Sequence, residues 1–274
     1  MFIDSHCHLN FPELRSQLPT ILSDMQAAQV DGALCIATTM DNFEDVHQLA
    51  TEHPNLWCTV GVHPDEEDTR EPSVEDLLAG AGRARVVGIG ETGLDYYRLN
   101  GRSLEDMAWQ RERFRVHIRA ARQLDLPLII HTRSASEDTL TILREEGGWA
   151  STDPHPQWPR ARGVFHCFTE AMAVAQAALA MDFYVSFSGI LTFKSAADLR
   201  EVARAVPLSR TLIETDSPYL APVPHRGKTN TPAWVPHVAQ CLADIHDVPL
   251  TQIAAQTREN FYALFNRVEP LEST

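Results

Sequence analysis

The chain has 274 residues, of which 44% are hydrophobic, and carries a formal net charge of −14 at pH 7. This length suits one large domain, since a (β/α)8 barrel needs roughly 250 residues. The acidic balance argues against a broad basic surface for duplex nucleic acid. It does not exclude a polyanionic substrate, because bound cations can reverse the local charge of a pocket.

The chain contains no apolar run long enough to span a membrane, for which about 18 residues are needed, and no pattern of a signal peptide. Its cysteines are odd in number, scattered and without a CxxC pair. They are Cys7, Cys35, Cys58, Cys167 and Cys241. This usage indicates reduced thiols and predicts a cytoplasmic protein without a membrane partner.

Short apolar runs alternate with amphipathic stretches along the whole chain. The runs that predict strands are 2–7, 33–38, 57–62, 86–91, 127–132, 163–167, 183–188 and 211–215. The stretches that predict helices are 17–29, 41–52, 73–83, 104–124, 136–146, 169–181, 195–206 and 249–265. Several strands are continuously apolar, as expected where both faces of a parallel strand are buried. We therefore expect an α/β fold, a (β/α)8 TIM barrel in a single domain over residues 1–266, with 267–274 as a short tail.

Two proline-rich segments interrupt this alternation, at 147–163 and 218–236, and both predict loops. The first contains Trp149 and Trp158, which could offer a stacking surface to nucleic acid bases. We favour the alternative that these rings pack back on the barrel.

The clearest chemical signal is a set of histidines and carboxylates at the ends of predicted strands. The set consists of His6, His8, His63, Glu91, His131, His166 and Asp216. His6 and His8 point to the same face of a strand, because side chains alternate with a period of two. In a closed barrel, all strand C-termini surround one mouth, so the whole set should converge there.

Imidazole and carboxylate together suit Zn, Mn or similar divalent cations, and one cation would leave too many ligands unused. We expect two divalent metal ions (Zn, Mg or Mn) about 3.5–4 Å apart, with Glu91 on a central strand as the bridge. Asp216 is the expected proton acceptor for the attacking water. His63 could be a ligand or a substrate contact. We favour a contact, because the other six residues already fill two sites.

Basic and amide residues follow two of these positions and bear on the substrate. Arg133 comes two residues after His131, and Arg226, Lys228 and Asn230 lie in the loop after Asp216. Guanidinium groups match phosphate oxygens bidentately. These four residues favour a phosphodiester substrate and are expected to bind it.

Residues 88–93 also match the GxGxxG pattern of dinucleotide-binding proteins. The pattern should open a helix, yet the next helical stretch begins only near residue 104. The match also contains Glu91, which the metal site requires. We therefore expect neither a nicotinamide nor a flavin cofactor. Asp95, just beyond, either supports a neighbouring ligand or holds the loop at the strand end.

Six separated segments resemble the TatD family of metal-dependent deoxyribonucleases, which are TIM barrels of the amidohydrolase type. The segments are Asp4–Leu9, Gly61–Pro64, Gly90–Tyr96, His131–Arg133, His166–Thr169 and Glu214–Leu220, and Arg226–Lys228 with Asn230 and Pro232 fits as well. The resemblance runs from residue 3 to about 265. Departures from the family pattern at Thr92, Ser134 and Glu170 spare the ligand set and bear on substrate preference.

The resemblance implies a division of the ligands and a direction of cleavage. His6, His8 and Asp216 would bind one metal, His131 and His166 the other, with Glu91 between them. It further implies hydrolysis from the 3′ end of DNA, with single strands preferred over duplex, by a hydroxide that two metals activate. We expect a monomer.

Two other classes of function remain open. The first is an amidohydrolase acting on an amide, lactone or ester, because the same chemistry attacks a carbonyl carbon. The second is a non-catalytic metal-binding scaffold, which the presence of Asp216 disfavours.

Overall fold

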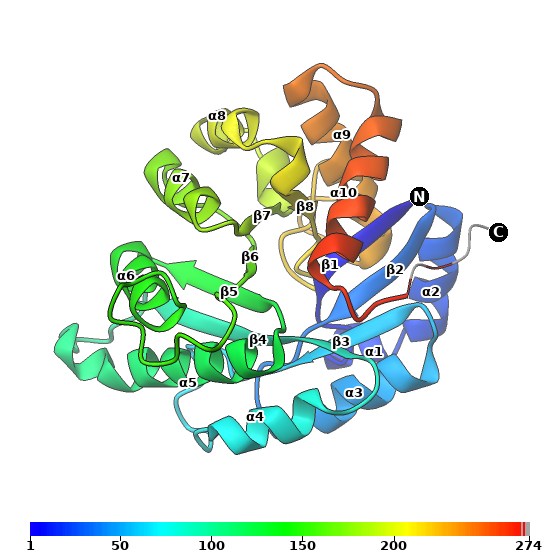
Figure 1. Ribbon diagram of the computed structural model, residues 1–274. Helices are drawn as coiled ribbons and strands as arrows, with labels where there is room; N and C mark the ends of the chain where they lie inside the picture. Colours follow the sequence, from blue (N-terminus) through cyan, green and yellow to red (C-terminus); the bar gives the residue numbers. More distant parts are fainter. Residues whose placement is uncertain (270, 272–274) are drawn as a thin grey trace.

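The computed structural model describes residues 1–269 and 271. Its described residues form one sheet of eight parallel strands in the order of the sequence, with helices around the outside (Figure 1). The strands are β1 (Phe2–Cys7), β2 (Val30–Cys35), β3 (Leu56–Val60), β4 (Val86–Asp95), β5 (Leu128–Arg133), β6 (Gly163–Phe165), β7 (Tyr184–Phe187) and β8 (Thr211–Ile213). The predicted TIM barrel is confirmed.

The α-helices alternate with the strands along the chain, and the last two follow β8. They are α1 (Pro12–Arg15), α2 (Leu18–Ala27), α3 (Phe43–Glu52), α4 (Val74–Ala81), α5 (Ala108–Leu124), α6 (Ser136–Glu146), α7 (Met172–Ala180), α8 (Ala197–Ala205), α9 (Val235–His246) and α10 (Leu250–Leu264). Four 3₁₀ turns are also described: η1 (Glu105–Met107), η2 (Gly189–Thr192), η3 (Leu208–Arg210) and η4 (Pro232–Trp234). None of the described helices is long and apolar enough to cross a bilayer.

Local sequence explains where several helices begin and end. α4 starts at a capping box, in which the Ser73 hydroxyl accepts from the Asp76 amide and the Asp76 carboxylate accepts from the Ser73 amide. α5 ends at Asp125, whose φ of 52° is left-handed. α9 was missed by the sequence analysis, which extended a proline-rich loop to Pro236. That proline sits in the first turn of the helix, where a missing N–H costs nothing.

The barrel closes between its first and last strands. Cys7 and Ser217 form an isolated parallel bridge, the Asp216 amide donates to the His6 carbonyl at 2.9 Å, and the His8 amide donates to the Ser217 carbonyl at 2.9 Å. Ser5 adds a side-chain bond from its hydroxyl to the Ile213 carbonyl at 2.9 Å. These contacts form the β1–β8 seam.

Two apolar layers stabilise this arrangement. The larger lies between strands and surrounding helices, with Phe114 and Ile118 of α5 fully buried in it. The smaller draws residues from every strand and packs against the end of α10. Its members are Ile3, Leu34, Ile36, Trp57, Val87, Ile129, Val164, Tyr184, Leu212, Phe261, Leu264, Phe265 and Val268. We call this second cluster the barrel plug; most of its strand residues lie in the N-terminal half of their strand.

The chain stays packed slightly beyond the predicted domain boundary. Val268 is buried in the barrel plug, and the Arg267 guanidinium donates to the Ala81 carbonyl at 2.8 Å. Residue 270 and residues 272–274 of the predicted tail lie outside the described residues.

Candidate metal centre

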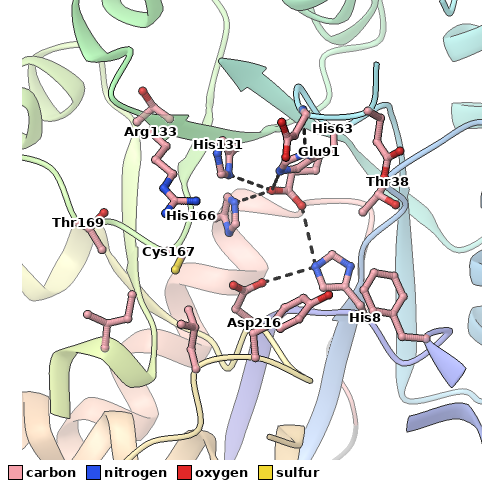
Figure 2. Close-up of a pocket in the computed structure, with 17 residues that line it drawn as sticks. His8, Thr38, His63, Glu91, His131, Arg133, His166, Cys167, Thr169 and Asp216 are labelled. Carbon is pink, nitrogen blue, oxygen red and sulfur yellow. Dashed lines mark hydrogen bonds and ion pairs between the residues drawn. The ribbon is translucent and has the colours of Figure 1, made fainter. Parts of the chain in front are cut away.

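All seven predicted strand-end histidines and carboxylates meet at one mouth, as Figure 2 shows for six of them. They line or underlie a pocket of about 640 Å³ at the C-terminal ends of the strands. His6, Glu91 and His131 lie within strands β1, β4 and β5, while His8, His63, His166 and Asp216 follow strands β1, β3, β6 and β8. Residues from positions 6 to 216 are thus brought together by barrel closure alone.

Glu91 lies at the centre of this cluster, and its two oxygens face different imidazoles. Oε1 lies 2.8 Å from His166 Nε2, 3.3 Å from His63 Nε2 and 3.3 Å from His131 Nδ1. Oε2 lies 3.3 Å from His6 Nε2. Figure 2 shows Glu91 with His63, His131 and His166 around it. A carboxylate with ligand atoms on both sides is suited to bridge two cations.

The other side of the cluster is formed by His6, His8 and Asp216. Asp216 Oδ1 lies 3.5 Å from His8 Nε2 and 3.6 Å from His6 Nε2, and the two imidazole nitrogens are 3.3 Å apart. Asp216 has a left-handed φ of 55°, with its amide held by the His6 carbonyl. This backbone bond fixes the carboxylate beside both histidines.

The side chain of Cys7 points away from this cluster, as predicted for the residue between two same-face histidines. Its thiol donates to the Leu34 carbonyl at 3.4 Å, and the residue is fully buried. All five cysteines are free.

Three of the imidazoles are oriented by a partner on their other ring nitrogen. His8 Nδ1 lies 3.3 Å from the Ile36 carbonyl, and His166 Nδ1 lies 3.3 Å from Glu214 Oε1. His131 Nε2 lies 3.0 Å from Asp95 Oδ2. Such partners fix the tautomer, so that the remaining nitrogen presents a lone pair to the cluster.

Two carboxylates, Asp95 and Glu214, lie behind His131 and His166. Both alternatives for Asp95 hold, since its second oxygen also accepts from the Tyr97 amide at 2.9 Å. Glu214 was not assigned a role. It is fully buried and also accepts from the Cys167 amide at 2.8 Å. Its position after a strand end was a signal, but only the fold shows that it lies behind His166.

Asp4 is a further buried carboxylate that sequence reasoning missed. It accepts from the Thr215 hydroxyl, from the Thr215 amide at 2.9 Å and from the His6 amide at 3.2 Å. Burial raises the pKa of Asp4 to about 8, although these hydrogen bonds act in the opposite direction. Asp4 therefore ties the segment before His6 to the segment before Asp216.

The electrostatics of the cluster favour ionised carboxylates. Burial acts to raise the pKa of Glu91, but the neighbouring His166, His63 and His6 lower it well below its usual range. Burial likewise acts to raise the pKa of Asp216, and His8 and His6 bring it below its usual value. Anionic oxygens are therefore ready as ligands.

The donor set fits divalent cations. His166 Nε2 faces Glu91 Oε1 at 2.8 Å and is buried without a hydrogen-bond partner, although buried polar atoms nearly always have one. Three sets of ligand atoms lie within 4.8 Å of one another: His6, His8 and Asp216; His6, Glu91 and His166; His63, Glu91 and His131. Nitrogen and carboxylate oxygen are the ligands of Zn and Mn, and carboxylate oxygen also suits Mg.

The predicted substrate residues fall into different places. His63 lies as close to Glu91 as His131 does, which makes it a candidate ligand as well as a contact. Arg133 lines the pocket, with its guanidinium 3.6 Å over the Tyr97 ring. Arg226 does not line it; its guanidinium lies 3.5 Å over Phe193, beside a separate surface hollow.

The other two predicted substrate residues in the loop after Asp216, Lys228 and Asn230, also lie outside the pocket. Lys228 is exposed. Asn230 is fully buried, and its amide nitrogen donates to the carbonyls of Thr215 at 2.9 Å and Tyr219 at 2.7 Å. Asn230 thus holds the backbone around Asp216, and its side chain has no free donor for a substrate.

The 147–163 loop precedes β6 and therefore lies at the barrel end opposite the pocket. Its tryptophans pack back on the barrel, as predicted: Trp149 packs against the larger apolar layer, and the Arg122 guanidinium of α5 lies 5.8 Å from the centroid of the Trp158 ring. The loop is anchored by Arg122, whose guanidinium makes two bonds to Asp153, at 2.9 and 2.7 Å.

The glycines of the GxGxxG match have a structural explanation within β4. A Cβ on Gly93 would lie 1.9 Å from the His131 carbonyl oxygen, and one on Gly88 would lie 2.7 Å from Ile129 Cδ1. These glycines let β4 lie directly against β5. The segment continues as strand to Asp95 and opens no helix there.

A closed eight-stranded barrel with histidines and carboxylates gathered at its C-terminal mouth defines the class of metal-dependent TIM-barrel hydrolases. Comparison with known proteins gives the family. The sequence profile described as "TatD related DNase" matches residues 3–266. The chain belongs to the TatD family, and it is a metal-dependent hydrolase of that family.

Relatives match along nearly their whole length. The chain is 44% identical to "Uncharacterized metal-dependent hydrolase YcfH" of Escherichia coli K12, over 96% of this chain and 95% of that protein. It is 36% identical to "Uncharacterized metal-dependent hydrolase YabD" of Bacillus subtilis, over 97% and 99%. The crystal structure of YJJV, a TatD homolog from Escherichia coli K12, superposes with a TM-score of 0.85 at 28% identity, over 97% and 98%.

Proposed function

We propose that this protein is a deoxyribonuclease that removes nucleotides from the 3′ end of DNA with the help of two divalent cations. The observation that carries the proposal is the position of Glu91, with His6 at one oxygen and three histidines at the other. The family description names a DNase, which supports DNA as the substrate. Five free cysteines suit a reducing compartment such as the cytoplasm.

The ligand division that we propose follows the two sides of Glu91. His6, His8 and Asp216 hold one cation, and His131 and His166 hold the other, with His63 close enough to join them. Bound cations of this kind lower the pKa of water and polarise the scissile phosphoryl group. The three buried partners Ile36, Glu214 and Asp95 keep the histidine rings in ligand orientation.

Asp216 has the position of the proton acceptor. Its side chain is 16% exposed, and it lines the pocket beside His6 and His8. Its lowered pKa keeps it ionised at neutral pH, so it accepts a proton from the attacking water and returns it to the leaving oxygen. Arg133, across the pocket from Asp216 in Figure 2, is the guanidinium available to a phosphate oxygen.

A carbonyl substrate is the second candidate, and a specific feature favours it. Asp65 and Glu66 line the same pocket, and among its described lining residues Arg133 is the one Lys or Arg. An amide, lactone or ester carries no negative charge to be repelled by these acids.

The test is digestion of single-stranded DNA labelled at its 3′ or 5′ end, with Mg, Mn or Zn added and an EDTA control. We expect metal-dependent shortening from the 3′ end. Asp216→Asn should lower the rate by about 10³-fold or more while the melting temperature of the metal-free protein stays close to wild type. Metal-loaded wild type that cuts no DNA but hydrolyses esters or lactones would move the assignment to the second candidate.

A further inference from the structure

Tyr219 is a large aromatic side chain exposed at the wall of the metal pocket. It is 54% exposed and lines the pocket together with Asp216, three residues earlier. A tyrosine ring offers a large flat apolar face, and one exposed at the wall of a site is available to a planar group of a substrate.

The backbone that carries this ring is fixed. The Tyr219 amide donates to the Asp216 carbonyl at 3.0 Å, and the Tyr219 carbonyl accepts from the buried Asn230 side chain at 2.7 Å. The next residue packs on η2, since a Cβ on Gly189 would lie 1.9 Å from the Leu220 carbonyl oxygen. A ring on a rigid segment loses little entropy when it binds a planar group.

Other aromatic rings at the mouth already have a stacking partner. Tyr97 carries the Arg133 guanidinium over one face of its ring, and Phe11 stacks on His8 with ring centroids 4.9 Å apart and planes 18° apart. Phe11 and Tyr219 are nearly perpendicular, at 78° and 6.3 Å between centroids. Phe11 therefore supports Tyr219 from one side and leaves much of its ring accessible.

Outside the proposed metal ligands, the charged side chains of the pocket contribute little affinity for DNA. Asp65 and Glu66 oppose Arg133 among its lining residues, in a chain of net charge −14. Exposed ion pairs contribute little to binding, whereas stacking of a base on an aromatic ring is a substantial and sequence-tolerant contribution. A base inside a duplex has both faces covered by its neighbours, so it must leave the stack before it can bind a protein ring.

We propose that Tyr219 is a stacking surface for an unpaired base next to the scissile bond, and that Asn230 positions it. This inference rests on the proposed function. It identifies the ring, rather than basic residues of the 218–236 loop, as the determinant that selects single-stranded ends.

The experiment compares two single-stranded oligonucleotides that differ only in their last two 3′ residues, which are ordinary nucleotides in one and abasic in the other. For the metal-loaded wild type we expect kcat/KM to be about 5- to 150-fold higher for the ordinary end, equivalent to about 1–3 kcal/mol of stacking. In Tyr219→Ala this ratio should fall toward one. Tyr219→Phe, which keeps the ring, should retain it, and Tyr219→Leu, which keeps apolar bulk, should lose most of it.

The outcomes separate the two proposals. If the wild type cuts both oligonucleotides and Tyr219→Ala keeps the full ratio, or if the wild type shows no preference, the stacking role is overturned and the nuclease assignment stands. If the metal-loaded wild type cuts neither oligonucleotide, the proposed function fails and the stacking role fails with it.

Discussion

The N-terminal half of the barrel interior is filled by Trp57, Phe261, Phe265 and other apolar side chains, whereas the C-terminal half is lined by histidines and carboxylates. The side chains of the barrel plug are apolar and interdigitate closely, so few other residues would fit at these positions. Among the proposed ligand atoms, His166 Nε2 is buried without a hydrogen-bond partner. The same strands thus stabilise the fold at one end and hold an unpaired ring nitrogen at the other. The difference teaches that stability and chemistry can be changed separately in this chain.

The largest effect is expected from Glu91→Gln at the polar end. This change removes the charge that both groups of ligands share, so activity should fall by about 10³-fold or more. In the wild type, free metal at 100-fold over its Kd should stabilise the fold by about 2.7 kcal/mol. That metal-induced rise in melting temperature should disappear in the variant. Scanning calorimetry during a metal titration measures the rise in melting temperature in the wild type and in the variant. A rise of wild-type size in Glu91→Gln would contradict a bridging role.

At the apolar end, Phe265→Ala should act on stability instead. Phe265 is fully buried in the barrel plug, and removing a buried aromatic ring costs about 3–5 kcal/mol. Urea unfolding of the metal-free protein measures the loss. Phe265→Leu, a smaller change, serves where the alanine variant does not fold. Activity per folded molecule should stay at the wild-type level in either variant, and a loss there would break the separation of the two ends.

A smaller effect on stability is expected from His117, a buried histidine of α5. It makes two hydrogen bonds near the polar end of the barrel. Its Nδ1 donates to the Arg113 carbonyl at 2.8 Å, and its Nε2 accepts from the Val62 amide at 3.0 Å, one residue before His63. Burial lowers the pKa of His117 to about 4. The folded state therefore prefers neutral imidazole, so this contribution is complete above pH 6.5 and is lost as the pH falls toward 4.

The size of this pH effect follows from the two pKa values. Between pH 7.5 and pH 4.5 the metal-free wild type should lose about 2–3 kcal/mol through this group alone. His117→Gln lacks the titration, so the loss of unfolding free energy over this range should be smaller in the variant by that amount. Equal losses in both proteins would show that His117 is not the neutral, buried group described above.

Much of the fold was predictable because both faces of each strand are buried. Continuous apolar runs placed all eight strands, although β2 begins and ends three residues before its predicted range and β4 continues to Asp95. Pattern alone could not set these ends, since register is decided by neighbouring strands. α9 was missed because prolines dominate the segment that leads into it.

The convergence of the proposed ligand residues was predictable because a barrel brings strand ends together whatever their distance in sequence. The buried carboxylates Asp4 and Glu214 were not, since their partners come from other strands. The structure of the loop after Asp216 could not be predicted either. Its composition indicated phosphate binding by Arg226, Lys228 and Asn230. Neither Arg226 nor Lys228 lines the pocket, and the Asn230 side chain donates to two backbone carbonyls.

The β1–β8 seam has a consequence for how the protein reaches its working state. Three ligands, His6, His8 and Asp216, lie on this seam, and hydrogen bonds join their backbones across it. These three residues come together only when β1 and β8 are paired. An N-terminal fragment that ends before β8 therefore lacks Asp216 and cannot form the complete set. A cation held there would bind only chains whose two ends have already met. Metal binding at this set would therefore follow closure of the barrel, and the bound metal would stabilise the closed form.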